Sequence, residues 1–478
     1  MKPRSAFAVR LCATPRKVQE KNRKPLCPEA LRAIESGHAT TADTPFPPVK
    51  KLTRRRARAL IRRHGPQSMV FRRRVAIGGG AISVGLFALV FASGADQVSE
   101  WFLDIVRVYP YLPLLLTPLG FVAIAYITNR TAPAARGSGI PQIIAAKSNP
   151  TEAVNSLMSM RTAVIKAVLT LGALLCGASV GREGPTVQLA AAVMAGWHRV
   201  LQAPMRASMV IAGGAAGVAA AFNTPLAGIA FAIEELAAAY EQRMTLLVMT
   251  AILISGMVAQ GVAGDYIYFG ITGASMPFKS ALVIVPLAGV VGGLLGGSFS
   301  RLLLLAARAD NAPMLWLRKN PLYSAGICGA IVAVLGVATN LTWGTGYAPA
   351  RAMIEGVHAP LWFGLAKFIT TAATAIAGLP GGIFAPSLAT GAGFGNLLRW
   401  IFPGEPASAV VLVGMTAYFT GVVRAPLTAV IIISETTVSR GLMLPMLGAA
   451  LIADQSSQLV CRDRLYHALS STFSTRES

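Results

Sequence analysis

The chain alternates between long apolar stretches and short polar connections, and this pattern predicts a series of membrane-spanning helices. A helical bilayer crossing needs about 20 mostly apolar residues. Apolar runs that could form such crossings occupy residues 75–93, 110–127, 162–180, 207–232, 244–263, 281–306, 322–339, 359–378, 407–433 and 441–453. Several runs are short or interrupted by glycine and proline, which is typical of the tilted and broken helices of membrane transporters.

A single carboxylate, Glu183, interrupts this apolar pattern within the sequence Gly-Arg-Glu-Gly-Pro at residues 181–185. An ionisable side chain at membrane depth is costly unless it faces a polar cavity or a partner, so Glu183 is a candidate functional residue. Pro185 favours a helix start, because proline is tolerated in the first turn. A helix that begins inside the bilayer points unpaired N–H groups and its positive dipole end into the protein, which predicts an anion site. Arg182 is not expected to neutralise Glu183, since neighbours on a helix do not face each other.

Two further glycine-rich segments precede predicted helix starts. Residues 136–142 read Arg-Gly-Ser-Gly-Ile-Pro-Gln, and residues 378–386 read Gly-Leu-Pro-Gly-Gly-Ile-Phe-Ala-Pro. Alone, the first segment would indicate an ordinary loop. Together, three such helix starts without nearby metal ligands favour a dehydrated monovalent anion held by N–H and O–H donors, whereas a cation would need carbonyl or carboxylate oxygens.

The chain also contains an internal repeat, in which positions separated by 201 residues match over about seventy residues. The matched pairs include Lys166 with Lys367, Thr170 with Thr371, Gly177 with Gly378, Gly181 with Gly382, Pro185 with Pro386, Gly213 with Gly414, Pro225 with Pro426, Leu226 with Leu427 and Glu234 with Glu435. Shared lysine, glutamate, proline and glycine in one ungapped register indicate a duplicated half. The register alone leaves open whether the two halves run parallel or inverted in the membrane.

The repeat distinguishes shared architecture from candidate chemistry. Glu234 is matched by Glu435, so we interpret Glu234 as a structural carboxylate with a partner. Glu183 instead falls on Phe384, and Glu235 falls on Thr436. Because neighbouring helical residues point about 100° apart, Glu234 and Glu235 are expected in different environments. We therefore expect Glu235 to face a water or proton route.

Composition supports an integral membrane protein. Apolar residues make up 54% of the chain and charged residues only 13%, with a mean hydropathy of +0.57, unlike ordinary soluble domains. The five cysteines and five histidines are scattered, without disulfide or metal-ligand spacing, so no metal and no cofactor are expected. The histidines also include no pair at helical metal-ligand spacing, so an intramembrane enzyme is not expected.

The net charge of +23 is concentrated before the first span, where residues 1–74 contain 20 Lys and Arg but only four acidic residues. This segment predicts a basic, largely disordered N-terminal arm on the cytoplasmic side of a cell membrane. Its expected partners are anionic lipid headgroups. Nucleic acid is the less favoured partner, because the arginine-rich run 54–74 contains a single aromatic residue, Phe71, whereas single-strand binders stack successive bases on several. A basic, acid-poor start could also imitate an organelle transit peptide.

Six segments of this sequence resemble, in order, the signatures of the CLC family of chloride channels and proton/chloride antiporters. They are GSGIPQ at 137–142, GREGP at 181–185, FNTPLAGIAFAIEEL at 222–236, GLPGGIFAP at 378–386, VVRAPLTAVIIISET at 422–436 and RLYHALS at 464–470. The resemblance implies an all-α polytopic membrane protein of the prokaryotic type, built from an inverted repeat of tilted and broken helices and forming a homodimer. It implies a transmembrane domain over residues 75–470, with halves of about 75–265 and 280–470, and a short tail at 471–478 without regulatory domains.

The resemblance also assigns roles to individual residues. It implies that the hydroxyls of Ser138 and Tyr466, with backbone amides near Ile383 and Phe384, bind the central anion. From the residues alone, Tyr466 would be an interfacial anchor. Glu183 would be the gating glutamate that competes with the anion when ionised.

Glu235 resembles the inner proton-transfer glutamate of the antiporters, which passive channel members generally lack. The resemblance therefore implies a proton-coupled chloride antiporter in the cell inner membrane. The alternative is a passive voltage- or pH-gated chloride channel on the same fold. Ser138 is typical of chloride-type members, whereas Gln142 departs from the usual glutamate after GSGIP and is expected to affect stability or pore potential.

Overall fold

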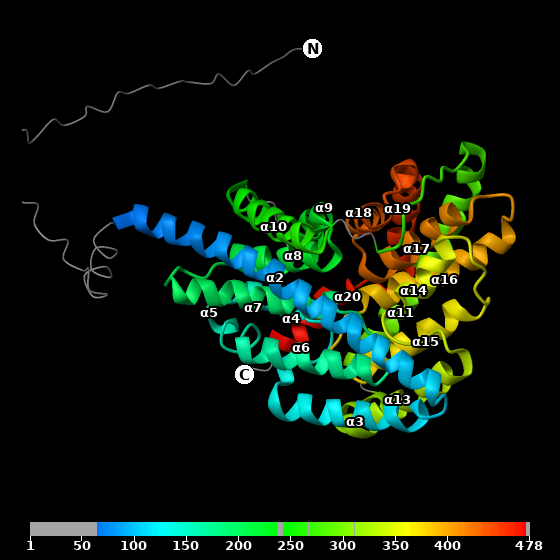
Figure 1. The fold of residues 1–478 in the computed structure, drawn as a ribbon, viewed down its shortest axis with the longest axis horizontal. Helices are drawn as coiled ribbons and strands as arrows, with labels where there is room; N and C mark the ends of the chain where they lie inside the picture. Colours follow the sequence, from blue (N-terminus) through cyan, green and yellow to red (C-terminus); the bar gives the residue numbers. More distant parts are fainter. Residues whose placement is uncertain (1–64, 237–241, 265–267, 310, 475–478) are drawn as a thin grey trace, which may run out of the picture. The chain divides into compact units, whose positions relative to one another are not determined.

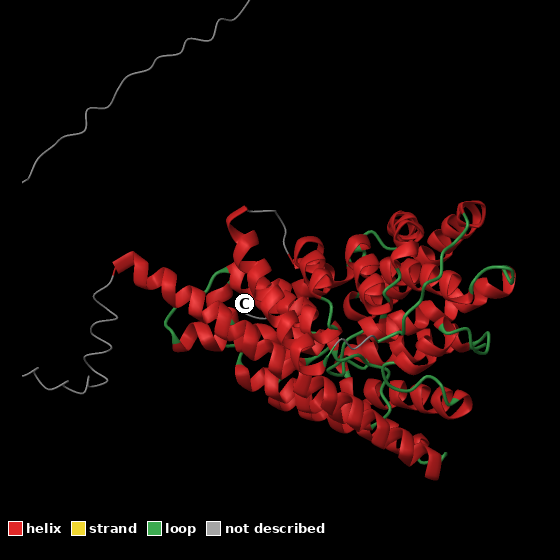
Figure 2. Ribbon diagram, turned by 45° about the horizontal axis from the view of Figure 1, so that its top comes forward, coloured by secondary structure: helices red, strands yellow, loops and turns green. Residues whose placement is uncertain are grey.

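The described part of the chain is built from helices, drawn in sequence colours in Figure 1. The computed structural model describes residues 65–236, 242–264, 268–309 and 311–474. Within these residues the extended structure is limited to one isolated bridge, and Figure 2 accordingly shows helices joined by loops. The helices are α2 (Gly65–Val108), α3 (Pro113–Thr131), α4 (Ile140–Ser148), α5 (Pro150–Ala153), α6 (Met160–Leu175), α7 (Glu183–Val200), α8 (Ala207–Phe222), α9 (Pro225–Phe231), α10 (Gln242–Ala263), α11 (Phe278–Arg308), α12 (Ala312–Lys319), α13 (Pro321–Thr339), α14 (Tyr347–Ile354), α15 (Phe363–Ile376), α16 (Phe384–Ile401), α17 (Ala407–Val423), α18 (Pro426–Thr437), α19 (Met443–Val460) and α20 (Leu465–Ser474), with short helical turns η2 (Pro133–Ala135), η3 (Ala232–Leu236) and η4 (Arg440–Leu442).

Two apolar runs each contain two helices, in agreement with the expectation that glycine and proline break several of the runs. The run 207–232 divides into α8 and α9, and the run 407–433 divides into α17 and α18. Asn223 and Arg424, which are equivalent in the repeat, both adopt left-handed conformations with φ of 57° and 60°. A left-handed residue ends the first helix, and the following proline starts the next one. By length and composition, four described helices could span a membrane, in α2, α10, α11 and α13.

The first helix begins before the apolar run that predicted it. Helix α2 starts at Gly65, so residues 65–74 of the predicted basic arm are helical. The rest of that arm, residues 1–64, and the final residues of the predicted tail, 475–478, lie outside the described residues.

The two halves repeat the same set of helix packings. Helices α7 and α16 start at residues 183 and 384, which the repeat makes equivalent, and α10 and α19 start at residues 242 and 443. In the first half α8 packs against α7, α10 and α2, and in the second half α17 packs against α16, α19 and α11. In Figure 1 helices α7, α8 and α10 lie on the left and helices α16, α17 and α19 on the right, while α2 runs across both. The repeat register seen in the sequence is therefore also the register of the structure.

A local two-fold axis relates the halves where they meet. Gly181 and Gly382 form the antiparallel bridge, and each N–H donates to the other's carbonyl oxygen at 2.7 Å. Since these residues are equivalent in the repeat, reciprocal bonds between them require a local two-fold relation. Equivalent helices also pack on each other across this junction, α3 against α13 and α9 against α18.

Glu234 and Glu435 join the halves by capping each other's helices. Glu234 accepts hydrogen bonds from the backbone N–H groups of Leu427 (3.0 Å) and Thr428 (2.7 Å) at the start of α18. Glu435 accepts the equivalent bonds from Leu226 (3.3 Å) and Ala227 (2.8 Å) at the start of α9. Carboxylates at helix N-termini satisfy unpaired donors and the helix dipole. The prediction that Glu234 is a structural carboxylate with a partner is confirmed.

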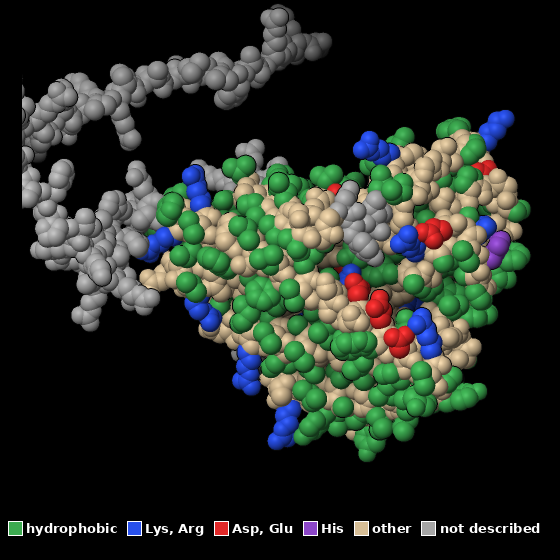
Figure 3. Space-filling model, in the orientation of Figure 1, with side chains coloured by type: hydrophobic (Ala, Val, Ile, Leu, Met, Phe, Trp, Pro, Cys, Tyr) green, Lys and Arg blue, Asp and Glu red, His purple; other side chains and the backbone are tan. Residues whose placement is uncertain are grey.

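Helix α11 crosses the second half at very short range. A Cβ added at Gly296 would lie 2.6 Å from the backbone of Tyr418 and Gly421 in α17, so only glycine fits this contact. The outward faces of the helices remain apolar, with Leu246 75% and Leu444 81% exposed. Figure 3 shows one such face, where hydrophobic side chains are widespread and charged ones are few. An apolar exterior of this kind suits contact with lipid.

Candidate functional site

Glu183 is the first residue of α7, as the Gly-Pro sequence after it predicted. Its side chain is fully buried, and the backbone N–H groups of Glu183 and Ala385 face the carboxylate. Tyr347 donates a hydrogen bond from its hydroxyl to Glu183 Oε1 at 2.5 Å, while Oε2 is buried without a hydrogen-bond partner among the described residues. The carboxylate therefore lies at a helix start, bound through one oxygen only.

The neighbouring cation, Arg182, points elsewhere, as predicted. Its guanidinium forms an ion pair with Asp96 at 2.6 Å and donates to the carbonyl of Ala92 at 2.6 Å and to the Tyr268 hydroxyl at 2.9 Å. Tyr268 in turn donates to a backbone carbonyl at the end of α8. Through these bonds Arg182 fixes the segment that leads into α7.

Tyr347 is held in position by two aromatic rings from the connection between α10 and α11. Its ring centroid lies 5.3 Å from that of Tyr268 and 5.4 Å from that of Phe269. Tyr347 and Arg182 also line a cavity of about 590 Å³, which Asp96, Glu100, Arg107 and Arg351 border with charged side chains. We call this space the Tyr347 cavity.

Ser138 and Tyr466, the hydroxyl donors expected at the anion site, line a second cavity of about 500 Å³. Ser138 Oγ and Tyr466 Oη are both buried without hydrogen-bond partners within the described residues. A buried hydroxyl without a partner is costly, so this arrangement suits an acceptor that binds between them. We call this space the Ser138 cavity; Arg136 and Arg318 are its charged lining residues in the described part of the chain.

The start of α7 contacts this second cavity as well. A Cβ added at Gly184 would lie 2.5 Å from Ser138 Oγ and 3.1 Å from the Cα of Gly382, so the position admits only glycine. Glu183 therefore lies between the two cavities. Its carboxylate is bonded to Tyr347, which lines the first cavity, and the next residue, Gly184, approaches Ser138, which lines the second.

Ile383 and Phe384 mark the start of α16, which is the symmetric counterpart of α7. Ile383 lines the Ser138 cavity. Phe384, in the position equivalent to Glu183, is buried among the rings of Phe222, Phe231, Phe419 and Tyr466, at centroid distances of 5.1–6.1 Å. One helix start therefore carries a titratable side chain and the other an aromatic one.

Glu235 lies in η3, a π-helical turn, and is buried with neither carboxylate oxygen forming a hydrogen bond to a described residue. Glu234 on the same turn caps α18, so the two neighbours occupy different environments as expected. The Nδ1 atom of His467 lies 3.3 Å from Glu235 Oε1. His467 directly follows Tyr466 on α20.

Gln142, the departure from the family pattern, has a defined structural task. Its Nε2 donates to the carbonyls of Ala134 at 3.1 Å and Arg136 at 2.6 Å. An ionised carboxylate has no N–H to donate, so glutamine suits this loop conformation. The loop is the one that presents Ser138.

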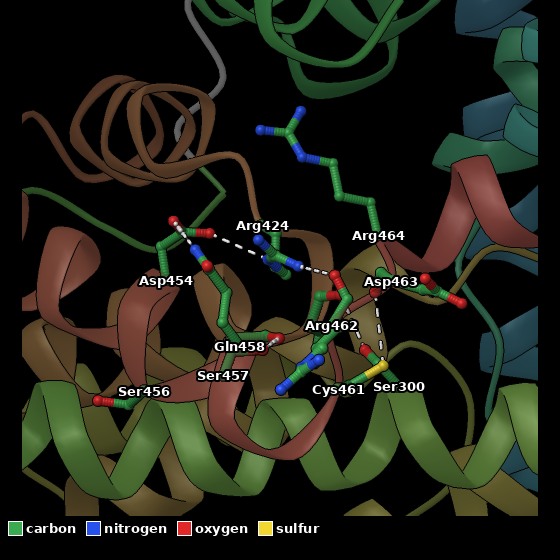
Figure 4. Close-up of polar contacts among 12 residues, drawn as sticks. Ser300, Arg424, Asp454, Ser456, Ser457, Gln458, Cys461, Arg462, Asp463 and Arg464 are labelled. Carbon is green, nitrogen blue, oxygen red and sulfur yellow. Dashed lines mark hydrogen bonds and ion pairs between the residues drawn. The ribbon is translucent and has the colours of Figure 1, made fainter.

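The beginning of α20 is fixed by a cluster around Arg424, shown in Figure 4. Arg424 is largely buried and pairs with Asp454 of α19 at 3.1 Å. Its Nη1 also donates to the carbonyl of Arg462 at 2.7 Å, and Gln458 donates to the other Asp454 oxygen at 3.0 Å. These bonds tie the segment before α20 to α17 and α19, and so position Tyr466.

Sequence reasoning missed Tyr347 and His467. Tyr347 is 164 residues from Glu183, and no local pattern connects the two positions. His467 directly follows Tyr466 in a family-like motif, which was the available signal. Its position among five scattered histidines gave no second signal.

Comparisons with known proteins agree with this architecture. The family model described as "Voltage gated chloride channel" matches residues 119–458. The chain is 31% identical over 414 residues to "H(+)/Cl(-) exchange transporter ClcA" of Yersinia pestis bv. Antiqua (strain Angola), covering 81% of this chain and 85% of that protein. It is 32% identical over 420 residues to the protein of the same name in Vibrio cholerae serotype O1 (strain M66-2), covering 81% and 86%.

Solved structures share the fold. A slow cyanobacterial Cl−/H+ antiporter matches with a TM-score of 0.74 and 21% identity, over 85% of this chain and 99% of that one. A eukaryotic CLC transporter matches with a TM-score of 0.69 and 22% identity, over 84% and 74%. The predicted fold class, an all-α polytopic membrane protein with the CLC-type inverted repeat, is confirmed. The chain belongs to the CLC family of voltage gated chloride channels and transporters.

Proposed function

We propose that this protein is a proton-coupled chloride antiporter that exchanges chloride for protons across a membrane. The observation that carries the proposal is the burial of two carboxylates near the Ser138 cavity: Glu183 directly precedes Gly184, which approaches Ser138, and Glu235 contacts His467, which directly follows Tyr466. The name of the ClcA relatives, H(+)/Cl(-) exchange transporter, supports the same activity. A protein that transports protons needs side chains that bind and release them, and Glu183 and Glu235 are two such groups.

In this proposal chloride binds between Ser138 and Tyr466. Both hydroxyls are buried and lack hydrogen-bond partners among the described residues, and chloride accepts hydrogen bonds from such donors. Backbone amides near Ile383 and Phe384, at the positive end of α16, complete the site. The two arginines of the Ser138 cavity attract anions toward it.

Glu183 acts as the gating glutamate. When it is ionised, its carboxylate occupies the positive start of α7 and excludes an anion from that position. When it is protonated, it loses its attraction to the helix start and chloride takes its place. Protonation of Glu183 is thereby coupled to chloride movement.

Glu235 is the inner proton-transfer residue and exchanges protons with one side of the membrane. The protein is expected in the cell inner membrane with a cytoplasmic N-terminus, in contact with lipids through its apolar surface and basic arm. It is further expected to act as a homodimer with one pathway in each subunit. The functional domain is taken as residues 75–470, with halves of about 75–265 and 280–470.

The test is proton pumping by the purified protein in liposomes. A chloride gradient should drive protons against their own gradient. Chloride flux without proton movement would instead identify a passive voltage- or pH-gated channel. Glu235→Gln should retain chloride flux and lose proton pumping, because an amide does not titrate; continued pumping by this variant would remove Glu235 from the mechanism.

A further inference from the structure

The environment of Glu235 lacks the donors that a permanently ionised buried carboxylate needs. Both oxygens are buried and form no hydrogen bond within the described residues. Burying a charge without hydrogen bonds is strongly unfavourable, so such a group is stabilised by taking up a proton. A residue that gains and loses protons there needs a connection to water.

His467 provides a contact between Glu235 and the surface. Its Nδ1 lies 3.3 Å from Glu235 Oε1, and its side chain is 38% exposed whereas that of Glu235 is fully buried. The imidazole therefore contacts the carboxylate through Nδ1, and part of its side chain is exposed at the surface. Histidine is the side chain best suited to exchange protons near neutral pH.

The position of His467 is determined by the packing of α20. The Arg424 cluster holds the segment before this helix, as Figure 4 shows. Arg308 of α11 donates to the carbonyl of Ala468 and, at 2.9 Å, to Ser471 Oγ. Helix α20 also packs against α4. The imidazole is thus presented by a helix fixed from several sides.

The other charged groups around Glu235 are engaged in structural bonds. Lys147 of α4 donates to the carbonyl of Leu236 at 3.0 Å, and Arg464 donates to the carbonyl of Glu234 at 3.3 Å. The Glu234 carboxylate caps α18. Asp463 pairs with Arg308. Among these neighbours, His467 is the one whose side chain contacts the Glu235 carboxylate.

Helix α20 also separates this contact from the anion site. Tyr466, Leu469, Thr472 and Phe473 line the Ser138 cavity, whereas His467 is not among the lining residues and contacts η3. Positions three, six and seven residues after Tyr466 recur on one face of a helix, and the next residue points about 100° away. A proton entering through His467 would not pass through the chloride-filled cavity.

We propose that His467 is the proton relay between solvent and Glu235, an inference that rests on the proposed antiport function. A neutral imidazole carrying hydrogen on Nδ1 transfers that proton to Glu235 Oε1. As the N–H bond breaks and the O–H bond forms, Nε2 takes a proton from water, and the imidazole remains neutral. The first tautomer returns when the ring turns Nδ1 toward water, where Nδ1 takes up a proton and Nε2 releases one, and the ring then turns back. One proton moves from water to the carboxylate, and the reverse sequence releases it.

The test compares two rates in liposomes containing the full-length protein, chloride flux and chloride-driven proton pumping. His467→Asn retains a donor near Nδ1 and cannot relay protons, so proton pumping should fall by roughly tenfold or more while chloride flux stays within about twofold of the parent rate. The matched control is His358→Asn, at an exposed histidine that contacts Arg399 and Trp400; both rates should be unchanged.

A second measurement separates a relay from a structural role. His467→Ala should regain proton pumping when millimolar imidazole is added, with no change in chloride flux. Unchanged proton pumping in His467→Asn, an equal loss of both rates, or failure of imidazole to rescue would each overturn the proposal. If one variant does not assemble, the other supplies the same comparison. Glu235→Gln is measured in parallel: if it loses pumping and His467→Asn does not, the relay is wrong and the antiport function stands.

Discussion

The hydrogen bond from Tyr347 to Glu183 makes the proposed gating role of Glu183 testable by removing one oxygen atom. In Tyr347→Phe the ring keeps its contacts with Tyr268 and Phe269, at 5.3 and 5.4 Å. What is lost is the 2.5 Å bond to Glu183 Oε1. The other oxygen already lacks a hydrogen-bond partner among the described residues, so no second side chain compensates.

The magnitude follows from the type of bond. A hydrogen bond to a charged group contributes about 1.5–3 kcal/mol, and each 1.4 kcal/mol corresponds to a tenfold change in an equilibrium constant. The equilibrium between the carboxylate in the closed position and the displaced carboxylate should therefore shift by roughly 10- to 100-fold toward the displaced form. Chloride flux at pH 7 should rise at least severalfold, up to the limit set by other steps.

The assay is chloride efflux from liposomes at pH 7 and pH 4.5. At acid pH the carboxylate is protonated more often in both proteins, so the advantage of Tyr347→Phe should shrink. Tyr418→Phe is the matched control, since Tyr418 is buried and its hydroxyl has no hydrogen-bond partner within the described residues. Equal efflux from Tyr347→Phe and the parent at pH 7 would refute the view that this bond holds the gate closed.

Three further predictions concern stability, measured as the thermal unfolding midpoint in detergent. Glu234→Ala removes the cap of α18 and should destabilise the protein by about 2–3 kcal/mol; an unchanged midpoint would show that the reciprocal caps do not hold the halves together. Gly296→Val should lower the free energy of unfolding by about 1–3 kcal/mol or more through overpacking. Gly261→Val is the control, because a Cβ at Gly261 meets open space, and it should lower the midpoint less. Arg424→Ala breaks a largely buried ion pair with Asp454 and should lower the free energy of unfolding by about 3 kcal/mol. Arg351→Ala removes an exposed pair and should lower it by less than about 1 kcal/mol. Similar losses of stability in both variants would contradict this ranking.

The sequence predicted those features that depend on local chemistry. Proline and glycine determine where α4, α7 and α16 begin, and all three starts were predicted from these residues. The matched glutamates of the repeat predicted that Glu234 is structural, because a residue shared by both halves is part of their common frame. The repeat also gave the register in which Gly181 and Gly382 face each other.

Features that depend on distant segments could not be predicted. The prolines at 225 and 426 indicate that the runs 207–232 and 407–433 are interrupted, but hydropathy does not report the left-handed residues at which the first helix of each pair ends. Tyr347 is held near Glu183 by its contacts with Tyr268 and Phe269, which lie in the connection between α10 and α11. His467 acquires a partner only once α20 packs beside η3.

The bridge between Gly181 and Gly382 has a consequence for the direction of transport. A frame with perfect two-fold symmetry would treat both faces of the membrane alike, and exchange on it could have no preferred orientation. The backbone at the junction is symmetric, with equal bonds in both directions. Any vectorial behaviour must therefore originate in side chains that differ between the halves, chiefly Glu183 against Phe384. The two faces of this molecule therefore differ through side chains such as Glu183 and Phe384 and through α20, which follows the second half, rather than through the backbone of the junction.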